Sequence, residues 1–188
     1  HVQEFYRGIP NCMVIDSERE DVKRRLVQAF SSDLIRFYYG GDMIGNEVGA
    51  AAKNVVGIAA GFLDGVEMSS LKGALMSRGT REVARLIRAM GGNELSAYGL
   101  CHLGDYEATV FSPYSHNRQF GESFIRHQDY HRLAEGYYTV EALMVLSERY
   151  QVELPICRAV HAILYENADP REQLTELLRR GLRAEFDD

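Results

Sequence analysis

The sequence lacks the short motifs that identify nucleotide-binding loops and serine hydrolases. No GxGxxG, Walker-type or GxSxG pattern occurs, so this chain alone is not expected to cradle a nucleotide. Cysteine is scarce: Cys12, Cys101 and Cys157 are odd in number and widely spaced. This pattern argues against a disulfide framework or a cysteine metal site and favours a reducing, cytoplasmic location.

Long apolar runs and clustered basic charge are also missing. No uninterrupted apolar run reaches the roughly 18 residues of a membrane span, and no secretory signal is recognised. The formal charge of −6 argues against a nucleic-acid partner. The six histidines show no ligand spacing, so no metal site is predicted. With 46% hydrophobic and 26% charged residues, the chain is typical of a globular protein with one good core.

The first forty residues predict a strand, a helix and a second strand. Asn11–Ile15 is a short apolar run of strand character, and Leu34–Tyr39 is an extended aromatic run. Ser17-Glu18-Arg19-Glu20 between them resembles a capping box, in which the Ser17 hydroxyl and the Glu20 carboxylate close a helix start. Apolar residues then recur with helical spacing as far as Phe30.

After Gly40-Gly41 the pattern is helical. A central helix is predicted over about Asp42–Gly65 and a second over Ser69–Met90, which Gly91-Gly92-Asn93 ends. The stretch 100–114 is expected to be loop with short helical turns. Further helices are expected near 115–126, 139–150, 155–165 and 170–180, the last capped by Asp169 before Pro170. The fold class is therefore mainly α, with a small strand–helix–strand piece at the front.

Lys53 is the most informative single residue, because the central helix around it is apolar on nearly every face. An ammonium buried there is desolvated, and desolvation favours the neutral form that can act as a base. Asn54 beside it would orient a hydroxyl or carbonyl. The structural alternative is a lysine whose nitrogen reaches solvent past the alanines, or one that pairs with Glu47.

Two further segments carry polar groups suited to a substrate. Asp105 and Thr109 lie one helical turn apart and could present a carboxylate and a hydroxyl to a polyol, although an Asp at a glycine turn commonly caps a short helix. Ser115-His116-Asn117-Arg118 resembles a helix start rich in hydroxyl, amide and cation, which suits a phosphate. Ordinary helix capping by Ser115 explains the same pattern.

Taken in order, these segments resemble the C-terminal half of bacterial-type NAD(P)-dependent glycerol-3-phosphate dehydrogenases. The similarity runs through nearly the whole chain. The segments that carry it are Ile44–Val55 (IGNEVGAAAKNV), Leu103-Gly104-Asp105, Ser112-Pro113 with Ser115–Gly121 (SHNRQFG), Ala134–Thr139 (AEGYYT), Val152–Ile156 and Asp169–Glu172. The resemblance implies an all-helical domain like the C-terminal domain of 6-phosphogluconate dehydrogenase for residues 41–188. Residues 1–40 would be the tail end of a dinucleotide-binding domain that otherwise precedes His1.

The resemblance also implies an activity and a site. Lys53 would accept the proton from the secondary hydroxyl of sn-glycerol 3-phosphate as hydride leaves for NAD or NADP, and would return it to dihydroxyacetone phosphate in reverse. The family feeds glycerophospholipid synthesis. The implied substrate-binding residues are Lys53, Asn54, Asp105, Thr109, Ser115, His116 and Asn117, and the implied cofactor-lining residues are His116, Leu133 and Glu135. The expected partner is a phosphorylated polyol, and a homodimer stays open.

Three positions depart from the family pattern around the implied pocket. His116 replaces an arginine that meets the substrate phosphate and the cofactor, Gln3 replaces a second active-site lysine, and Ser69-Ser70 replaces an Asp-Asn pair. A histidine is shorter and cannot make a bidentate phosphate contact. Two alternatives therefore stay open. One is a divergent paralogue acting on another hydroxy compound, and the other is a helical binding or oligomerisation module without chemistry.

Overall fold

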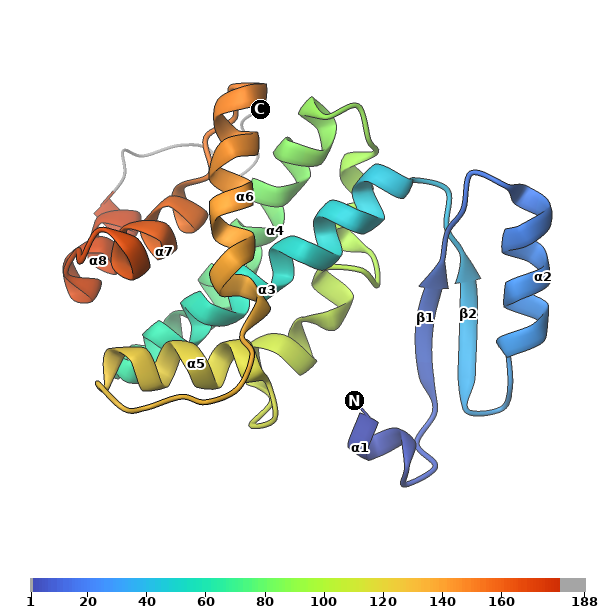
Figure 1. Ribbon diagram of the computed structural model, residues 1–188, viewed down its shortest axis with the longest axis horizontal. Helices are drawn as coiled ribbons and strands as arrows, with labels where there is room; N and C mark the ends of the chain where they lie inside the picture. The colour runs from blue at the N-terminus through green and yellow to red at the C-terminus, as the bar shows by residue number, and fades with distance from the viewer. Residues whose placement is uncertain (1, 180–188) are drawn as a thin grey trace.

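The computed structural model describes residues 2–179, in which a parallel strand–helix–strand unit stands beside a helical body (Figure 1). The unit consists of β1 (Asn11–Ile15), α2 (Glu20–Phe30) and β2 (Ile35–Tyr39), preceded by the short α1 (Val2–Phe5). The two strands pair in parallel, with Asn11 opposite Ile35 and Ile15 opposite Tyr39. The predicted strand–helix–strand order is confirmed, and α1 was not predicted.

The predicted capping box at the start of α2 is wrong. The helix begins at Glu20, and the Ser17 hydroxyl accepts a hydrogen bond from the Arg19 amide, 3.1 Å away, in a local turn. The Ser17 amide donates to Asp16 Oδ1 at 2.8 Å, so it is not free to meet the Glu20 carboxylate. That carboxylate instead pairs with Lys23 and Arg24, at 2.8 and 2.9 Å. Neither contact that a capping box requires is therefore present at this helix start.

The helical body confirms the mainly α fold class. Its elements in order are α3 (Met43–Gly65), the 3₁₀ turn η1 (Ser69–Leu71), α4 (Lys72–Ala89), the 3₁₀ turns η2 (Glu94–Tyr98) and η3 (Leu103–Asp105), the π-helical turn η4 (Glu107–Phe111), α5 (His116–Ile125), α6 (Glu135–Tyr150), α7 (Pro155–Tyr165) and α8 (Pro170–Arg179). Gly91, with φ of +88°, ends α4 as predicted. Asp169 Oδ1 accepts from the Glu172 amide at 2.8 Å, which confirms the predicted cap of α8. No helix among residues 2–179 is long and apolar enough to cross a bilayer.

Helix α3 is the centre of the body, as its sequence predicts. Every residue from Val55 to Leu63 is buried, and α3 packs against α4, α5, α6 and α7 (Figure 1). Small residues let the neighbouring backbones come close, which a helix with bulky side chains on every face would prevent. Lys53 and Asn54 lie just before this buried stretch.

Hydrogen bonds accepted by one carboxylate join the strand unit to the start of α3. Asp16, directly after β1, accepts from the Asp42 amide at 2.8 Å and from Asn46 Nδ2 at 2.7 Å through Oδ2. The Lys23 ammonium of α2 donates to the Gly40 carbonyl oxygen at 2.6 Å. The end of β1 therefore has a fixed place near the beginning of the central helix.

Helices α3 and α5 cross at two glycines without room for side chains. A Cβ on Gly121 would overlap the carbonyl oxygen of Ile58, and a Cβ on Gly61 would overlap that of Arg118. We expect Gly121→Ala to reduce the free energy of unfolding by about 1–3 kcal/mol, because backbone would have to move. Urea denaturation of the purified protein measures this change.

Gly73 in the first turn of α4 provides the matched control, because a Cβ there would meet nothing within 4 Å. Gly73→Ala should leave stability unchanged or raise it by up to about 1 kcal/mol, since alanine is the better helix former. Equal stability of both alanine variants would contradict the tight crossing.

Candidate functional site

Lys53 and Asp105 form an ion pair that joins α3 to the turn η3. Asp105 ends the turn Leu103–Asp105, and its Oδ2 receives the Lys53 ammonium. The two side chains are 24% and 37% exposed, so the pair lies at the surface edge of the core and is reachable from solvent. The expected full burial of Lys53 is therefore wrong, because the ion pair holds the amine where solvent still reaches it. Its partner is Asp105 and not Glu47, the partner in the structural alternative.

A chain of amide contacts begins at Asn54, next to Lys53 in the sequence, and joins three helices. Asn54 Oδ1 accepts from Asn117 Nδ2 on α5 at 3.1 Å, and Asn54 Nδ2 donates to Glu135 Oε2 on α6 at 3.1 Å. Asn117 Oδ1 in turn accepts from the Gly136 amide at 2.9 Å. These bonds fix which way both amides point, since each donor and each acceptor has one suitable partner. Residues far apart in sequence thus meet at Asn54, the residue that follows Lys53 on α3.

The other predicted site residues adopt different environments. Ser115 caps α5, with its hydroxyl accepting from the Arg118 amide at 3.3 Å, so the capping alternative describes its contact. Thr109 in η4 is buried, with 6% exposure. His116 and Glu135 are exposed, and Leu133 is 64% exposed. The side chain of Gln3 lies outside the described part of the structure.

A second charge cluster, not predicted as a unit, holds the start of α5. Asp64 at the end of α3 accepts from Lys72 and Arg118, each at 2.7 Å, and from the Ser69 hydroxyl at 2.6 Å. Burial alone would raise the pKa of the Asp64 carboxyl, but these hydrogen bonds outweigh it and hold the pKa below its usual range. Ser69 lies in η1 and bonds Asp64, which is about three turns along α3 from Lys53, so the structure does not place Ser69 beside the Lys53–Asp105 pair.

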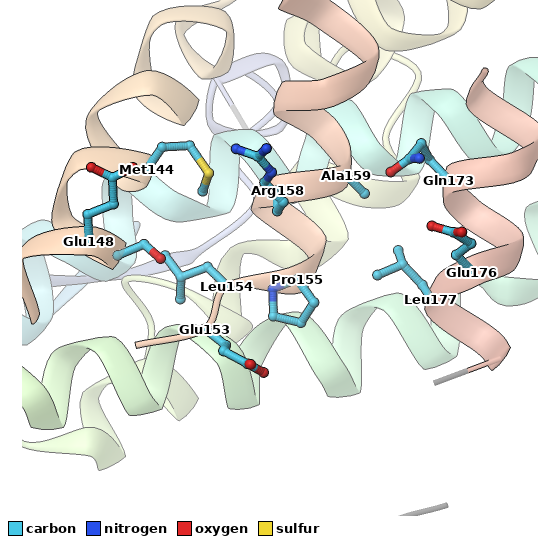
Figure 2. Close-up of a pocket in the computed structure, with 11 residues that line it drawn as sticks. Met144, Glu148, Glu153, Leu154, Pro155, Arg158, Ala159, Gln173, Glu176 and Leu177 are labelled. Carbon is cyan, nitrogen blue, oxygen red and sulfur yellow. The ribbon is translucent and has the colours of Figure 1, made fainter. Parts of the chain in front are cut away.

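A pocket of about 480 Å³ lies elsewhere, between α6, α7 and α8 (Figure 2). Glu148, Glu153 and Glu176 line it together with Arg158, Leu154 and Pro155. None of the residues predicted for the site lines it. Among the described residues, no cluster of His, Cys, Asp and Glu could hold a metal ion. The Lys53–Asp105 pair and its amide chain therefore form the candidate site on chemical grounds.

Residues 42–175 match the family model for the "NAD-dependent glycerol-3-phosphate dehydrogenase C-terminus". This chain belongs to that family. The matched span contains Lys53, Asn54, Asp105, Asn117 and Glu135, and so the whole amide chain described above. The family assignment predicted from sequence motifs is confirmed.

Named relatives and solved structures agree with the family model. The chain is 39% identical over 191 residues to "Glycerol-3-phosphate dehydrogenase [NAD(P)+]" of Thermus thermophilus, covering 98% of this chain and 59% of the relative. A Salinibacter ruber relative is 35% identical, covering 98% and 57%. The crystal structure of glycerol-3-phosphate dehydrogenase from Coxiella burnetii superposes with a TM-score of 0.90 at 30% identity, covering 96% and 58%. The chain thus spans less than two thirds of the length of these relatives.

Proposed function

We propose that this chain is the substrate-binding and catalytic part of an enzyme that interconverts sn-glycerol 3-phosphate and dihydroxyacetone phosphate with NAD or NADP. The observation that carries the proposal is the Lys53–Asp105 ion pair beside the Asn54–Asn117 amide chain, within the span that matches the family. The substrate is taken from the names of the relatives.

Lys53 is the proton carrier in this proposal. Paired with a carboxylate it is an ammonium, which is the form that donates a proton to a ketone oxygen during reduction. In the oxidation direction the amine must first lose its proton and then accept one from the secondary hydroxyl. Asp105 orients the amine, and its exposed carboxylate can also accept a hydrogen bond from a substrate hydroxyl.

The neighbouring polar groups hold the rest of the substrate. Asn54 and Asn117 present fixed amides next to Lys53, while Thr109, Ser115 and His116 are assigned to the remaining hydroxyl and phosphate contacts. Fixed orientation matters because a positioned base and substrate react far faster than free ones. In this assignment the N-terminus of α5 faces the phosphate. The N-terminus of a helix favours a bound anion.

The residues assigned to the cofactor are exposed, so their side chains are accessible to a ligand. Leu133 exposes 64% of its surface just before α6, and Glu135 bonds Asn54, which adjoins Lys53. When bound, the nicotinamide accepts or supplies the hydride. His116, Leu133 and Glu135 would line one side of it, and the glycine-rich loop that dinucleotides require is not among the residues of this chain.

We also propose the domain division, location and partners that the sequence suggests. Residues 1–40 would end a dinucleotide-binding domain, since β1, α2 and β2 form the parallel unit of which such domains consist. Residues 41–188 would be the helical domain. Three free cysteines support a cytoplasmic location, and the charge of −6 argues against a nucleic-acid partner. A homodimer and a role in supplying glycerophospholipid synthesis belong to the same proposal.

The direct test is turnover by the complete protein that carries this chain. Oxidation of NADH and of NADPH is followed by absorbance with dihydroxyacetone phosphate, and with a panel of other phosphorylated and carboxylated keto compounds. Reduction of dihydroxyacetone phosphate above all others supports the proposal. A preference for another compound would indicate a divergent dehydrogenase. Ligand binding without any redox turnover would indicate a module that has lost the chemistry.

We expect His116→Arg to strengthen binding of glycerol 3-phosphate. An arginine contributes a bidentate, permanently charged contact to phosphate, and a hydrogen bond to a charged group contributes about 1.5–3 kcal/mol. The KM should therefore fall by about tenfold or more. His127→Arg, at the opposite end of α5, adds the same charge and should leave the KM unchanged. Equal effects of the two substitutions would mean that His116 does not meet the phosphate.

A further inference from the structure

His102 is fully buried between α3 and η3 and uses both ring nitrogens. Nδ1 lies 2.8 Å from the Gly49 carbonyl oxygen, and Nε2 lies 2.6 Å from the Tyr106 hydroxyl. A carbonyl oxygen can only accept, so Nδ1 carries the proton and donates it. Nε2 then has a free lone pair, which accepts from the Tyr106 O–H. The ring is therefore a neutral bridge with a single tautomer.

Burial keeps this bridge neutral. His102 and Tyr106 are both 0% exposed. Burial lowers the pKa of the His102 imidazole to about 4 and raises the pKa of the Tyr106 phenol. Neither side chain changes its charge near neutral pH, and so neither can exchange protons with a substrate. Their contribution is geometric.

The bridge joins the two backbone segments that carry the ion pair. Gly49 is one helical turn before Lys53, so its carbonyl oxygen also accepts the Lys53 amide within α3. On the other side, the Asp105 amide donates to the His102 carbonyl oxygen at 3.0 Å. The approach is close, because a Cβ on Gly49 would lie 3.2 Å from His102 Cβ. A shift of the imidazole therefore moves Lys53 relative to Asp105.

We propose that His102 is a positioning residue that sets the relative placement of Lys53 and Asp105 through its hydrogen bond to Gly49. The effect on turnover rests on the proposed function, whereas the effect on the ion pair does not. Catalysis is sensitive to such placement, since a displacement of about 1 Å can lower the rate by about 10²-fold.

Two amide substitutions separate the two bonds of the ring. His102→Asn keeps a donor near the Nδ1 position and loses the contact with Tyr106. His102→Gln places its amide near the Nε2 position and loses the donor to Gly49. Each variant keeps one of the two hydrogen bonds of the ring. If His102 had only a structural role, the two variants would therefore have similar kcat values and similar labelling of Lys53. Tyr106→Phe is the third variant, because it removes the hydroxyl and leaves the Gly49 bond.

Kinetics of the complete protein and chemical labelling of Lys53 provide the readouts. We expect His102→Gln to lower kcat about 10–100-fold with little change in KM, and His102→Asn and Tyr106→Phe to keep kcat within about threefold. The rate of Lys53 acetylation, followed by peptide mass spectrometry, should be higher in His102→Gln than in the wild-type protein and should approach the rate in Asp105→Asn. It should stay at the wild-type rate in His102→Asn.

The labelling keeps the two proposals distinguishable. If the wild-type protein shows no turnover, the proposed function fails, and faster Lys53 labelling in His102→Gln alone still supports the positioning role. Equal kcat and equal labelling in the Asn and Gln variants would overturn that role, whatever their thermal stability.

Discussion

Replacing Lys53 with alanine is expected to lower kcat by about 10²–10⁴-fold, because a positioned proton donor and acceptor contributes a factor of that size. The KM should change less than kcat does, since Asp105, Asn54 and Asn117 remain to hold the substrate. Steady-state reduction of dihydroxyacetone phosphate by the complete protein measures both constants. Turnover that survives the substitution unchanged would mean that Lys53 carries no proton.

Two controls separate proton transfer from loss of the ion pair. Lys53→Arg keeps a cation for Asp105 but does not release its proton near neutral pH, so it should lose kcat about as far as alanine does. Adding a small primary amine to Lys53→Ala should restore part of the rate, because the site is partly open to solvent. An active Lys53→Arg would assign the residue an electrostatic role instead.

The elements of this fold could be predicted where the pattern is local. Small and apolar residues on every side of Asp42–Gly65 indicate a helix at the centre of a body, and α3 is that helix. The turn at Gly91 and the cap at Asp169 follow from the residues themselves. At Ser17 the local pattern predicted a capping box that is absent, because Asp16 accepts the hydrogen bond of the Ser17 amide and also joins β1 to α3.

Helix caps supplied by a distant segment could not be predicted in this way. Helix α6 begins at Glu135, four residues before the predicted Thr139, and its Gly136 amide is capped by Asn117 from α5. Helix α7 begins at Pro155, as predicted, but Leu154 before it cannot cap, and the first amides of α7 bond to Glu82 of α4. A helix start without a local Ser, Thr, Asp or Asn is the signal that a remote acceptor is required.

The site could be predicted as a set of residues but not as a geometry. The motifs named Lys53, Asn54, Asp105 and Asn117, and the structure connects them in two contact groups, Lys53 with Asp105 and Asn54 with Asn117. The ion pair of Lys53 with Asp105 was not predicted, because the sequence around Asp105 shows no helical periodicity that would place its side chain. His102 was missed too, since nothing in the sequence distinguishes it from the other scattered histidines.

Replacing Glu82 with alanine is expected to reduce the free energy of unfolding by about 3–5 kcal/mol. Glu82 is 2% exposed, and its two carboxylate oxygens accept from the Ile156 amide at 2.8 Å and the Cys157 amide at 3.0 Å. Truncation leaves two buried N–H groups without acceptors, at about 1–3 kcal/mol each, and adds a cavity. Urea denaturation measures the loss. Glu141→Ala on the exposed face of α6 is the matched control and should change stability by no more than about 0.5 kcal/mol.

Glu82→Gln adds a pH signature that distinguishes the carboxylate from mere packing. Burial raises the pKa of the Glu82 carboxyl above 4.5, more than the bonds from Cys157 and Ile156 lower it. The folded state then binds a proton at a higher pH than the unfolded state does. Wild-type stability relative to Glu82→Gln should therefore rise as pH falls from the folded pKa toward 4.5, and be lost again as pH rises. A stability difference that does not change with pH between neutrality and 4.5 would show that the pKa of Glu82 is not raised into that range.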